Sequence, residues 1–156
     1  MDLHPRAQSV AQALADLGSD AQPRMLPDSA RTAQEAADSL GVDIGAIVKS
    51  LVFDCDGEPV MVLCSGAHNV DTAAVARTAG LPPLRRAAPD FVRSATGQSI
   101  GGVAPVGHPT HVRALLDTAL AQYPQVWAAA GHPHAVFPTT FEELCKLTDG
   151  MPVDVR

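Results

Sequence analysis

A lysine lies inside an apolar run that has the composition of a β-strand. The run AIVKSLVF at residues 46–53 contains Lys49, one of two lysines in a chain with nine arginines. Side chains alternate between the two faces of a strand, so Lys49 shares a face with Ile47, Leu51 and Phe53. An ammonium group in an apolar row is costly unless something solvates it. Two interpretations stay open. Lys49 is either the floor of a cleft that binds a carbonyl, phosphate or developing oxyanion, or an edge-strand lysine that deters aggregation or reaches out to solvent.

A second segment, SATGQSIGGVAPVGHPTH at residues 94–111, concentrates glycine and proline between two apolar runs. Residues 97–101 fit the G-x-S-x-G pattern of serine-hydrolase elbows, but the glycines and proline after Ser99 disfavour the helix that an elbow requires. The glycine patterns of phosphate-binding loops do not occur in the sequence. Gly101 and Gly102 permit close approach of the backbone to a ligand. The segment therefore predicts either an anion or carbonyl site built from backbone N–H groups, or a surface loop without a ligand.

No metal site and no disulfide framework is expected. The three cysteines are odd in number, have no C-x-x-C spacing, and are interpreted as small buried apolar residues. Two histidine pairs, His108 with His111 and His132 with His134, lack a third ligand at motif spacing.

Arg85, Arg86 and Arg93 form the densest basic cluster, just before the glycine-rich segment. Such a cluster can contact nucleic-acid phosphates, and a solvated surface is the alternative. The formal net charge of −6 disfavours generic coating of nucleic acid but allows a local basic patch. One Trp, one Tyr and four Phe leave few platforms for stacking single-stranded bases.

Length and composition favour one compact domain spanning residues 1–156. Apolar residues make up 46% of the chain, enough for a full core at this size. The N-terminal stretch is amphipathic and lacks the apolar centre of a signal peptide, and no window is long and apolar enough to span a bilayer. We therefore expect a cytoplasmic protein that does not bind membranes.

Predicted strands and helices are interspersed along the chain. Apolar periodicity and capping residues predict helices at residues 6–17, 33–41, 71–79, 89–95 and 141–148. β-rich runs occupy residues 46–54, 60–64, 112–116, 126–129, 135–138 and 153–155. Asp56-Gly57 predicts a hairpin between the first two of these runs. Because several links are hairpin-like, the pattern favours a mixed β-sheet with flanking helices over a doubly wound parallel sheet.

Three blocks of sequence, taken together, resemble those of a known family. They are GVDIGAIVKSLVF at residues 41–53, TGQSIGGVAPVGH at residues 96–108 and AAGHP at residues 129–133. In this order they resemble the YbaK-like prolyl-tRNA editing family of aminoacyl-tRNA deacylase domains. The lysine and glycine blocks are specific only in combination. The resemblance runs from about residue 34 to residue 148, nearly the whole chain.

The resemblance implies a fold, an activity and partners. The fold is α/β of the mixed α+β kind, with a strongly curved, barrel-like sheet and flanking helices. The activity is hydrolysis of the ester that joins a wrong, small amino acid to the 3′-terminal adenosine of a tRNA. Alanine on tRNA(Pro) is the first expectation, and serine, threonine and cysteine stay open. A free-standing chain of this length is similar to trans-editing enzymes. Mischarged tRNA, bound by its 3′ acceptor end, is the expected partner, and an aminoacyl-tRNA synthetase is a further candidate. No metal or cofactor is implied, and we expect a monomer.

The resemblance also implies a site. Lys49 would contact the substrate near its ester and terminal phosphate, while the amides of Gly101 and Gly102 hold the carbonyl or orient water. The ribose hydroxyl can assist, so no protein nucleophile is needed and Ser99 has no role. Related alanine-specific members carry a histidine near His132, which is therefore expected in the catalytic set, an ordinary turn histidine being the alternative. The expected substrate-binding residues are Val103, Pro105, Gly131, Arg85 and Arg86.

Two other functions stay open. A non-catalytic module could bind the aminoacyl-tRNA 3′ end or a synthetase, which the acidity and the few aromatic residues allow. An esterase could use Ser99 as its nucleophile, in which case Ser99 rather than Lys49 would be essential.

Overall fold

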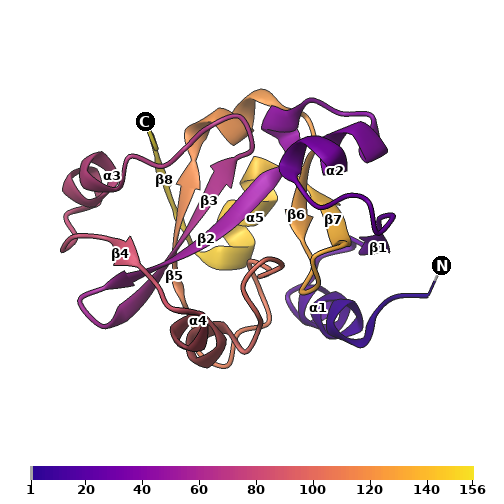
Figure 1. Cartoon of the computed structure of the whole chain (residues 1–156), viewed down its shortest axis with the longest axis horizontal. Helices are drawn as coiled ribbons and strands as arrows, with labels where there is room; N and C mark the ends of the chain where they lie inside the picture. Colours follow the sequence, from indigo (N-terminus) through magenta and orange to yellow (C-terminus); the bar gives the residue numbers. More distant parts are fainter. Residues whose placement is uncertain (1) are drawn as a thin grey trace.

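The computed structural model describes residues 2–156, which form two β-sheets surrounded by helices (Figure 1). The five-stranded sheet has the order β4 (Arg85–Arg86), β2 (Val48–Cys55), β3 (Glu58–Ser65), β5 (Arg113–Asp117) and β8 (Met151–Val153). The three-stranded sheet has the order β1 (Arg24–Met25), β7 (Ala135–Thr139) and β6 (Val126–Ala129). The helices are α1 (Pro5–Asp16), α2 (Ala33–Leu40), α3 (Thr72–Ala79), α4 (Pro89–Thr96) and α5 (Phe141–Thr148). Within the described range, no helix combines the length and hydrophobicity needed to cross a membrane.

The five-stranded sheet is mixed, as the hairpin-like links predicted. β2 pairs antiparallel with β3 and β4, whereas β5 runs parallel to β3 and β8. The mixed α/β class is therefore confirmed. Neither sheet closes on itself, so the expected barrel-like shape is only a loose description of the two sheets.

Local sequence signals account for most element boundaries. Thr32 and Thr140 accept hydrogen bonds from the N–H groups three residues later and so cap α2 and α5. The hairpin between β2 and β3 turns at Asp56 and Gly57, both of which have positive φ. These short-range interactions need no tertiary contact, which is why the sequence predicted them.

Three details of the strands differ from the prediction. A 3₁₀ turn at Ile44–Ala46 precedes β2, so the strand begins at Val48. β8 occupies Met151–Val153 and so lies two residues earlier than expected, because it pairs with β5 in the register Leu115 to Met151. Arg85–Arg86 forms the unpredicted strand β4, because Phe53 and Asp54 of β2 offer it an edge to pair with.

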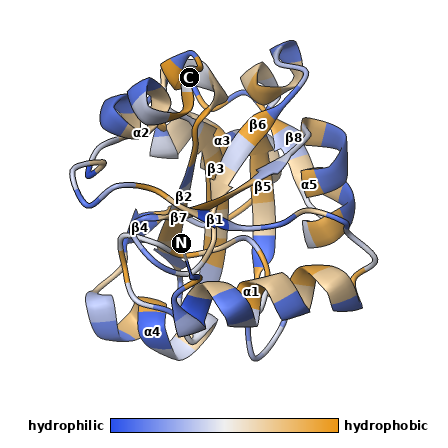
Figure 2. Cartoon of the chain, turned by 90° about the vertical axis from the view of Figure 1, so that its right-hand side faces the viewer, coloured by the Kyte–Doolittle hydropathy of each residue, from blue (hydrophilic) through white to orange (hydrophobic). Residues whose placement is uncertain are grey.

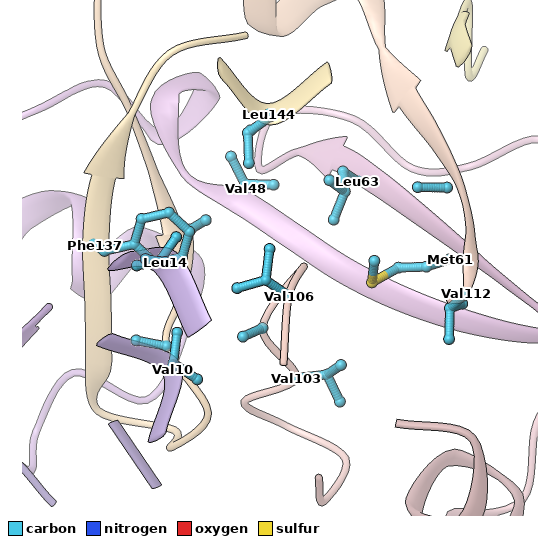
Figure 3. Close-up of a cluster of buried hydrophobic side chains, with 14 of the residues drawn as sticks. Val10, Leu14, Val48, Met61, Leu63, Val103, Val106, Val112, Phe137 and Leu144 are labelled. Carbon is cyan, nitrogen blue, oxygen red and sulfur yellow. The ribbon is translucent and has the colours of Figure 1, made fainter. Parts of the chain in front are cut away.

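Apolar side chains pack on both faces of the five-stranded sheet. Met61 and Leu63 of β3 belong to a cluster with Val10 and Leu14 of α1 and with Phe137 of β7 (Figure 3). The alternate residues of β3, Val60, Val62 and Cys64, instead pack with Val75 of α3. Figure 2 shows apolar residues concentrated on the central strands, whereas the surrounding helices carry hydrophilic residues as well. The five-stranded sheet therefore lies between two apolar clusters, one on each face.

Candidate functional site

A cavity of about 590 Å³ lies along the edge of β2 that does not pair with β3. On this edge β4 meets β2 only at Phe53 and Asp54, and β6 meets it only at a bridge between Ile47 and Trp127. Between those points this edge of β2 has no partner strand, and the residues of that stretch line the cavity. The opening thus occurs where the two sheets diverge, and its size is typical of small-molecule pockets.

The cavity brings together the two motifs singled out in the sequence. Lys49 of β2 and Gly101, Gly102 and Val103 of the glycine-rich segment all contribute to its lining. Arg31 and Arg86 add two further cationic side chains, while no carboxylate is found among the residues that line it. Most of the remaining wall is apolar. Such a site suits a ligand that carries negative charge and a small apolar part.

Lys49 is half-buried, and its amine does not extend into bulk solvent. Its Nζ donates a hydrogen bond to the main-chain carbonyl of His68, in the turn after β3. The side chains of Leu51 and Phe53, which follow on the same face of β2, pack against the cluster under α3. The Lys49 side chain therefore stays on the face of β2 that it shares with Leu51 and Phe53.

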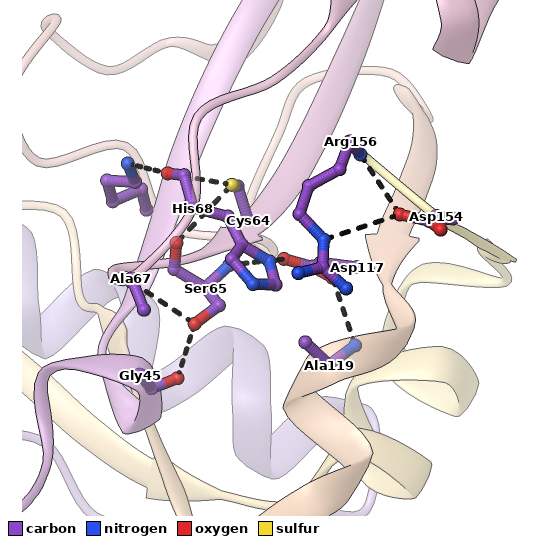
Figure 4. Close-up of polar contacts among 10 residues, drawn as sticks. Gly45, Cys64, Ser65, Ala67, His68, Asp117, Ala119, Asp154 and Arg156 are labelled. Atoms are coloured by element: carbon purple, nitrogen blue, oxygen red, sulfur yellow. Dashed lines mark hydrogen bonds and ion pairs between the residues drawn. The ribbon is translucent and has the colours of Figure 1, made fainter.

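The turn that receives Lys49 is itself fixed by a buried carboxylate. Asp117, at the end of β5, is 1% exposed, and its Oδ2 lies 2.9 Å from Nδ1 of His68 (Figure 4). Because a carboxylate oxygen only accepts, the imidazole donates this bond. The same carboxylate accepts the N–H groups of Ser65 at 3.0 Å and Ala119 at 2.9 Å. Asp117 therefore joins the ends of β3 and β5 and holds the His68 turn against Lys49.

Cys64 lies beside this network but lacks the properties of a nucleophile. Burial raises the pKa of its thiol to about 11, an effect that the positive charge of Lys49 only partly opposes. The thiol therefore stays protonated at neutral pH, which agrees with the prediction of a small buried apolar residue.

The glycine-rich segment is tied to itself by two polar side chains. The Gln98 side-chain amide accepts the N–H of Ala104 at 2.7 Å and donates to the carbonyl of Val106 at 3.1 Å. His108 Nε2 lies 2.7 Å from the carbonyl of Ala104 and donates to it. Burial lowers the pKa of His108, so the imidazole is held neutral. These contacts give the loop a defined shape without a helix or strand.

A backbone hydrogen bond joins the glycine-rich segment to the third sequence block. The N–H of Gly131 donates to the carbonyl of Gly102 at 2.9 Å. A Cβ atom at Gly102 would lie 2.7 Å from the carbonyl carbon of His132 and 2.8 Å from the nitrogen of Pro133, so only glycine fits. Within residues 2–156, no backbone acceptor receives the N–H of Gly101 or Gly102. Both glycines line the cavity, so two peptide donors without a backbone partner lie in its wall.

Ser99 lies in an irregular segment, because α4 ends at Thr96 and no helix follows the serine. It is not part of the cavity lining. A nucleophile elbow needs a strand before its serine and a helix directly after it, and neither is present here.

His132 lies beside two other histidines in tilted ring contacts, and none of the three belongs to the cavity lining. Its ring centroid lies 4.3 Å from that of His4 and 5.6 Å from that of His134. Its Nδ1 accepts the N–H of His134 at 3.1 Å. Burial, together with the neighbouring His4 and His134, lowers the pKa of His132. Pro133, the next residue, does line the cavity, so a direct role of His132 stays a prediction.

The other predicted residues divide into two groups. Arg86 lines the cavity, whereas Arg85, its neighbour on the short strand β4, does not, since adjacent strand residues face opposite sides. Pro105 and Gly131 are buried behind the wall.

Among residues 2–156, no group of three or more His, Cys, Asp or Glu side chains is arranged to hold a metal ion.

Four residues with evident structural roles at the site escaped the sequence analysis. Gln98 lay within a recognised motif, but nothing in its spacing indicated which atoms it would join. His68 and Asp117 are 49 residues apart, and Arg31 precedes α2, far from the arginine cluster. Only folding brings these side chains to the edge of β2.

The chain matches known proteins over most of its length. Residues 27–147 match the family model of the aminoacyl-tRNA editing domain. The uncharacterized protein YwhH of Bacillus subtilis (strain 168) is 31% identical over 121 residues, which cover 77% of this chain and 76% of YwhH. The proline–tRNA ligase of Nitratidesulfovibrio vulgaris (strain DP4) is 35% identical over 91 residues, which cover 58% of this chain but only 16% of the ligase.

Solved structures agree with these sequence matches. A crystal structure provisionally described as a trans-editing enzyme for prolyl tRNA synthetase superimposes with a TM-score of 0.95 at 44% identity, and covers 99% of both chains. The crystal structure of the hypothetical protein APE2540 superimposes with a TM-score of 0.84 at 28% identity, and covers 94% of this chain and 98% of that one.

Proposed function

Because the chain belongs to the family of aminoacyl-tRNA editing domains, we propose that it is a trans-editing hydrolase that removes a small amino acid from mischarged tRNA. Alanine on tRNA(Pro) is the proposed first substrate. The observation that carries the proposal is the placement of Lys49 and the Gly101–Gly102 peptide groups around one cavity. The structural likeness to a provisional trans-editing enzyme for prolyl tRNA synthetase supports the choice of tRNA(Pro).

The proposed reaction needs positioning and charge stabilisation more than a protein nucleophile. Water attacks the carbonyl carbon of the ester, and the N–H groups of Gly101 and Gly102 stabilise the negative charge that develops on the carbonyl oxygen. The bond to the ribose oxygen then breaks, and the proton lost by water passes through the neighbouring ribose hydroxyl to the leaving oxygen. The products are the free amino acid and a tRNA with an intact terminal adenosine.

Lys49 has a different role in this proposal. Its amine, held by the His68 carbonyl, supplies positive charge for the terminal phosphate and the ester. Arg86 and Arg31 at the cavity would bind phosphates of the 3′ acceptor end, so tRNA is the proposed partner. The amine and the peptide donors thereby fix the ester in one orientation.

Selectivity for a small amino acid would come from exclusion. Six alanines contribute to the wall, together with bulkier groups such as Trp127 and Leu26. A tight pocket rejects larger side chains sterically but discriminates poorly among smaller ones. Gly131 and Pro105, buried behind the wall, would support the loop, and His132 would act on the pocket through Pro133. We further propose that residues 1–156 act as a single editing domain, and that a synthetase is a second partner.

A deacylation panel tests the proposal. Purified protein is incubated with tRNA(Pro) charged with alanine, serine, threonine, cysteine or proline, and loss of the ester is followed. We expect alanyl-tRNA(Pro) to be hydrolysed fastest and the Lys49→Ala variant to be slower by about two orders of magnitude. Lys146→Ala is the matched control, because Lys146, the other lysine, is exposed on α5 away from the cavity.

Other outcomes would point elsewhere. Ester loss at the buffer rate for every substrate would contradict the proposed hydrolysis. Tight tRNA binding without turnover would favour a non-catalytic binding module. Loss of activity in Ser99→Ala with full activity in Lys49→Ala would favour an esterase built on Ser99.

A further inference from the structure

Two buried polar side-chain atoms form no hydrogen bond within residues 2–156, and both belong to residues that line the cavity. They are Oγ of Ser50 and Nε1 of Trp127. Buried polar groups in folded proteins almost always have a partner, because an unpaired one loses its hydrogen bonds to water without replacing them. Their common location in one cavity indicates that a ligand supplies the partners.

The register of β2 shows how Ser50 is presented. The carbonyl of Ile47 accepts the N–H of Gly66, so the peptide groups of Ile47 point toward β3. Peptide groups alternate in direction along a strand, so those of Ser50 point toward the unpaired edge. β4 and β6 meet this edge only on either side of Ser50. The carbonyl and N–H of Ser50 therefore point toward the unpaired edge that borders the cavity, and its side chain belongs to a lining residue with an unpaired hydroxyl.

The charges around the cavity restrict what these groups can bind. Lys49, Arg31 and Arg86 contribute positive charge, and no lining residue is a carboxylate. A ligand amine can therefore be received only by neutral acceptors. Three lining residues carry hydroxyls. Thr32 is exposed and already accepts the N–H of Glu35, Thr72 is half-buried at the start of α3, and only Ser50 has a fully buried hydroxyl without a partner. The indole N–H of Trp127 can only donate. Ser50 offers a free hydroxyl and a carbonyl side by side.

We propose that Ser50 binds the α-amino group of the aminoacyl ester, through its Oγ and its main-chain carbonyl. This inference rests on the proposed function, because it assumes an aminoacyl ligand. The amine then lies on the face of β2 that carries Val48 and Val52, across from Val103 of the glycine-rich segment. The ester carbonyl can extend from there toward the N–H groups of Gly101 and Gly102.

The test measures binding and needs no turnover. The first probe is 3′-alanylamido-3′-deoxyadenosine, in which an amide replaces the ester. The second is its 3′-propionylamido counterpart, which lacks only the α-amino group. Titration calorimetry should show that the native protein binds the alanyl probe at least about tenfold more tightly, as expected for a hydrogen bond to a charged group. In Ser50→Ala the affinity for the alanyl probe should fall to about that for the propionyl probe, and the affinity for the propionyl probe should stay unchanged. Ser94→Ala, on the exposed side of α4, should keep the native ratio.

Several outcomes would overturn the inference. Equal affinity of the native protein for both probes would contradict it, and this result does not depend on whether Ser50→Ala folds. Failure of the native protein to bind either probe would contradict it too. Equal weakening of both probes in Ser50→Ala would show that Ser50 acts on the cavity shape rather than on the amine. A parallel assay on alanyl-tRNA(Pro) separates the two proposals. Turnover without amine discrimination contradicts the Ser50 contact alone, and amine discrimination without turnover contradicts the hydrolysis alone.

Discussion

The amine of Lys49 donates to the main-chain carbonyl of His68, and the imidazole of His68 is held in turn by Asp117 at 2.9 Å. The lysine that lines the cavity is thus oriented by a carboxylate on a different strand. Because the carbonyl belongs to the backbone, no substitution of His68 removes it. A change in Asp117 or in the His68 ring can only loosen the turn that presents it.

Replacement of Asp117 should cost both stability and activity. Asp117→Ala leaves the buried N–H of Ser65 without its acceptor and frees the His68 ring, so we expect a loss of about 2–4 kcal/mol in the free energy of unfolding. Urea denaturation measures this. His68→Ala should keep most of the stability but lower kcat on alanyl-tRNA(Pro), because the turn that presents the carbonyl to Lys49 is loosened. Asp154→Ala is the control, since its ion pair with Arg156 is exposed. A His68→Ala variant with native kcat would contradict this role for the turn.

Alanine substitutions of Gly101 and Gly102 should both lower activity, but for different structural reasons. Gly102→Ala places a Cβ against the backbone of His132 and Pro133. It should therefore push the glycine-rich segment away from the block at residues 129–133 and lower activity by at least about tenfold. Gly101→Ala has room but a φ of +90°, so its cost is backbone strain of about 1–2 kcal/mol. Gly80→Ala carries similar strain at a φ of +68° at the end of α3. Thermal unfolding and deacylation rates should show comparable destabilisation at residues 80 and 101, with activity lost only at 101. Native activity in Gly102→Ala would contradict the tight junction.

Arg85 and Arg86 should differ in their effect on tRNA binding. Only Arg86 lines the cavity, so Arg86→Ala should weaken binding of the acceptor end and lower the slope of log Kd against log salt by about 0.7 for one single-strand phosphate. Arg85→Ala, one residue away on the same strand, should leave that slope unchanged. Fluorescence anisotropy of a labelled acceptor-stem RNA at several salt concentrations gives both slopes. Equal effects of the two substitutions would indicate a diffuse basic patch.

Stability should fall with acidity because of His108. Burial lowers its pKa in the folded protein, so the unfolded chain binds this proton more readily. The free energy of unfolding should therefore decrease as the pH falls below about 6.5, the ordinary histidine value, and level off below the folded pKa. Urea titrations between pH 5 and pH 8 measure this slope. His108→Asn, which can still donate to the Ala104 carbonyl, should reduce this slope. His111→Asn, exposed on the same loop, should change it much less, because the charge of His111 makes only a minor contribution to lowering the His108 pKa. An unchanged slope in His108→Asn would assign the effect to other groups.

The sequence by itself determined the elements, because their signals are local. The capping threonines act within one turn of helix, the Asp56-Gly57 turn within one hairpin, and the apolar runs within single strands. It also determined that Lys49 and Ser50 lie on opposite faces of β2, since side chains alternate along any strand. The pairing of the lysine with the glycine-rich segment as parts of one site came from the resemblance to a family.

Tertiary structure alone decided that both faces of β2 border one cavity. β4 is too short to cover the edge of β2, and β6 joins it at a single bridge, so the gap opens around Lys49 and Ser50 together. Partners such as Asp117 and His68, 49 residues apart, meet only when β3 and β5 pair. An unpaired edge and a long-range hydrogen bond are properties of how strands assemble. No pattern within one strand can encode them.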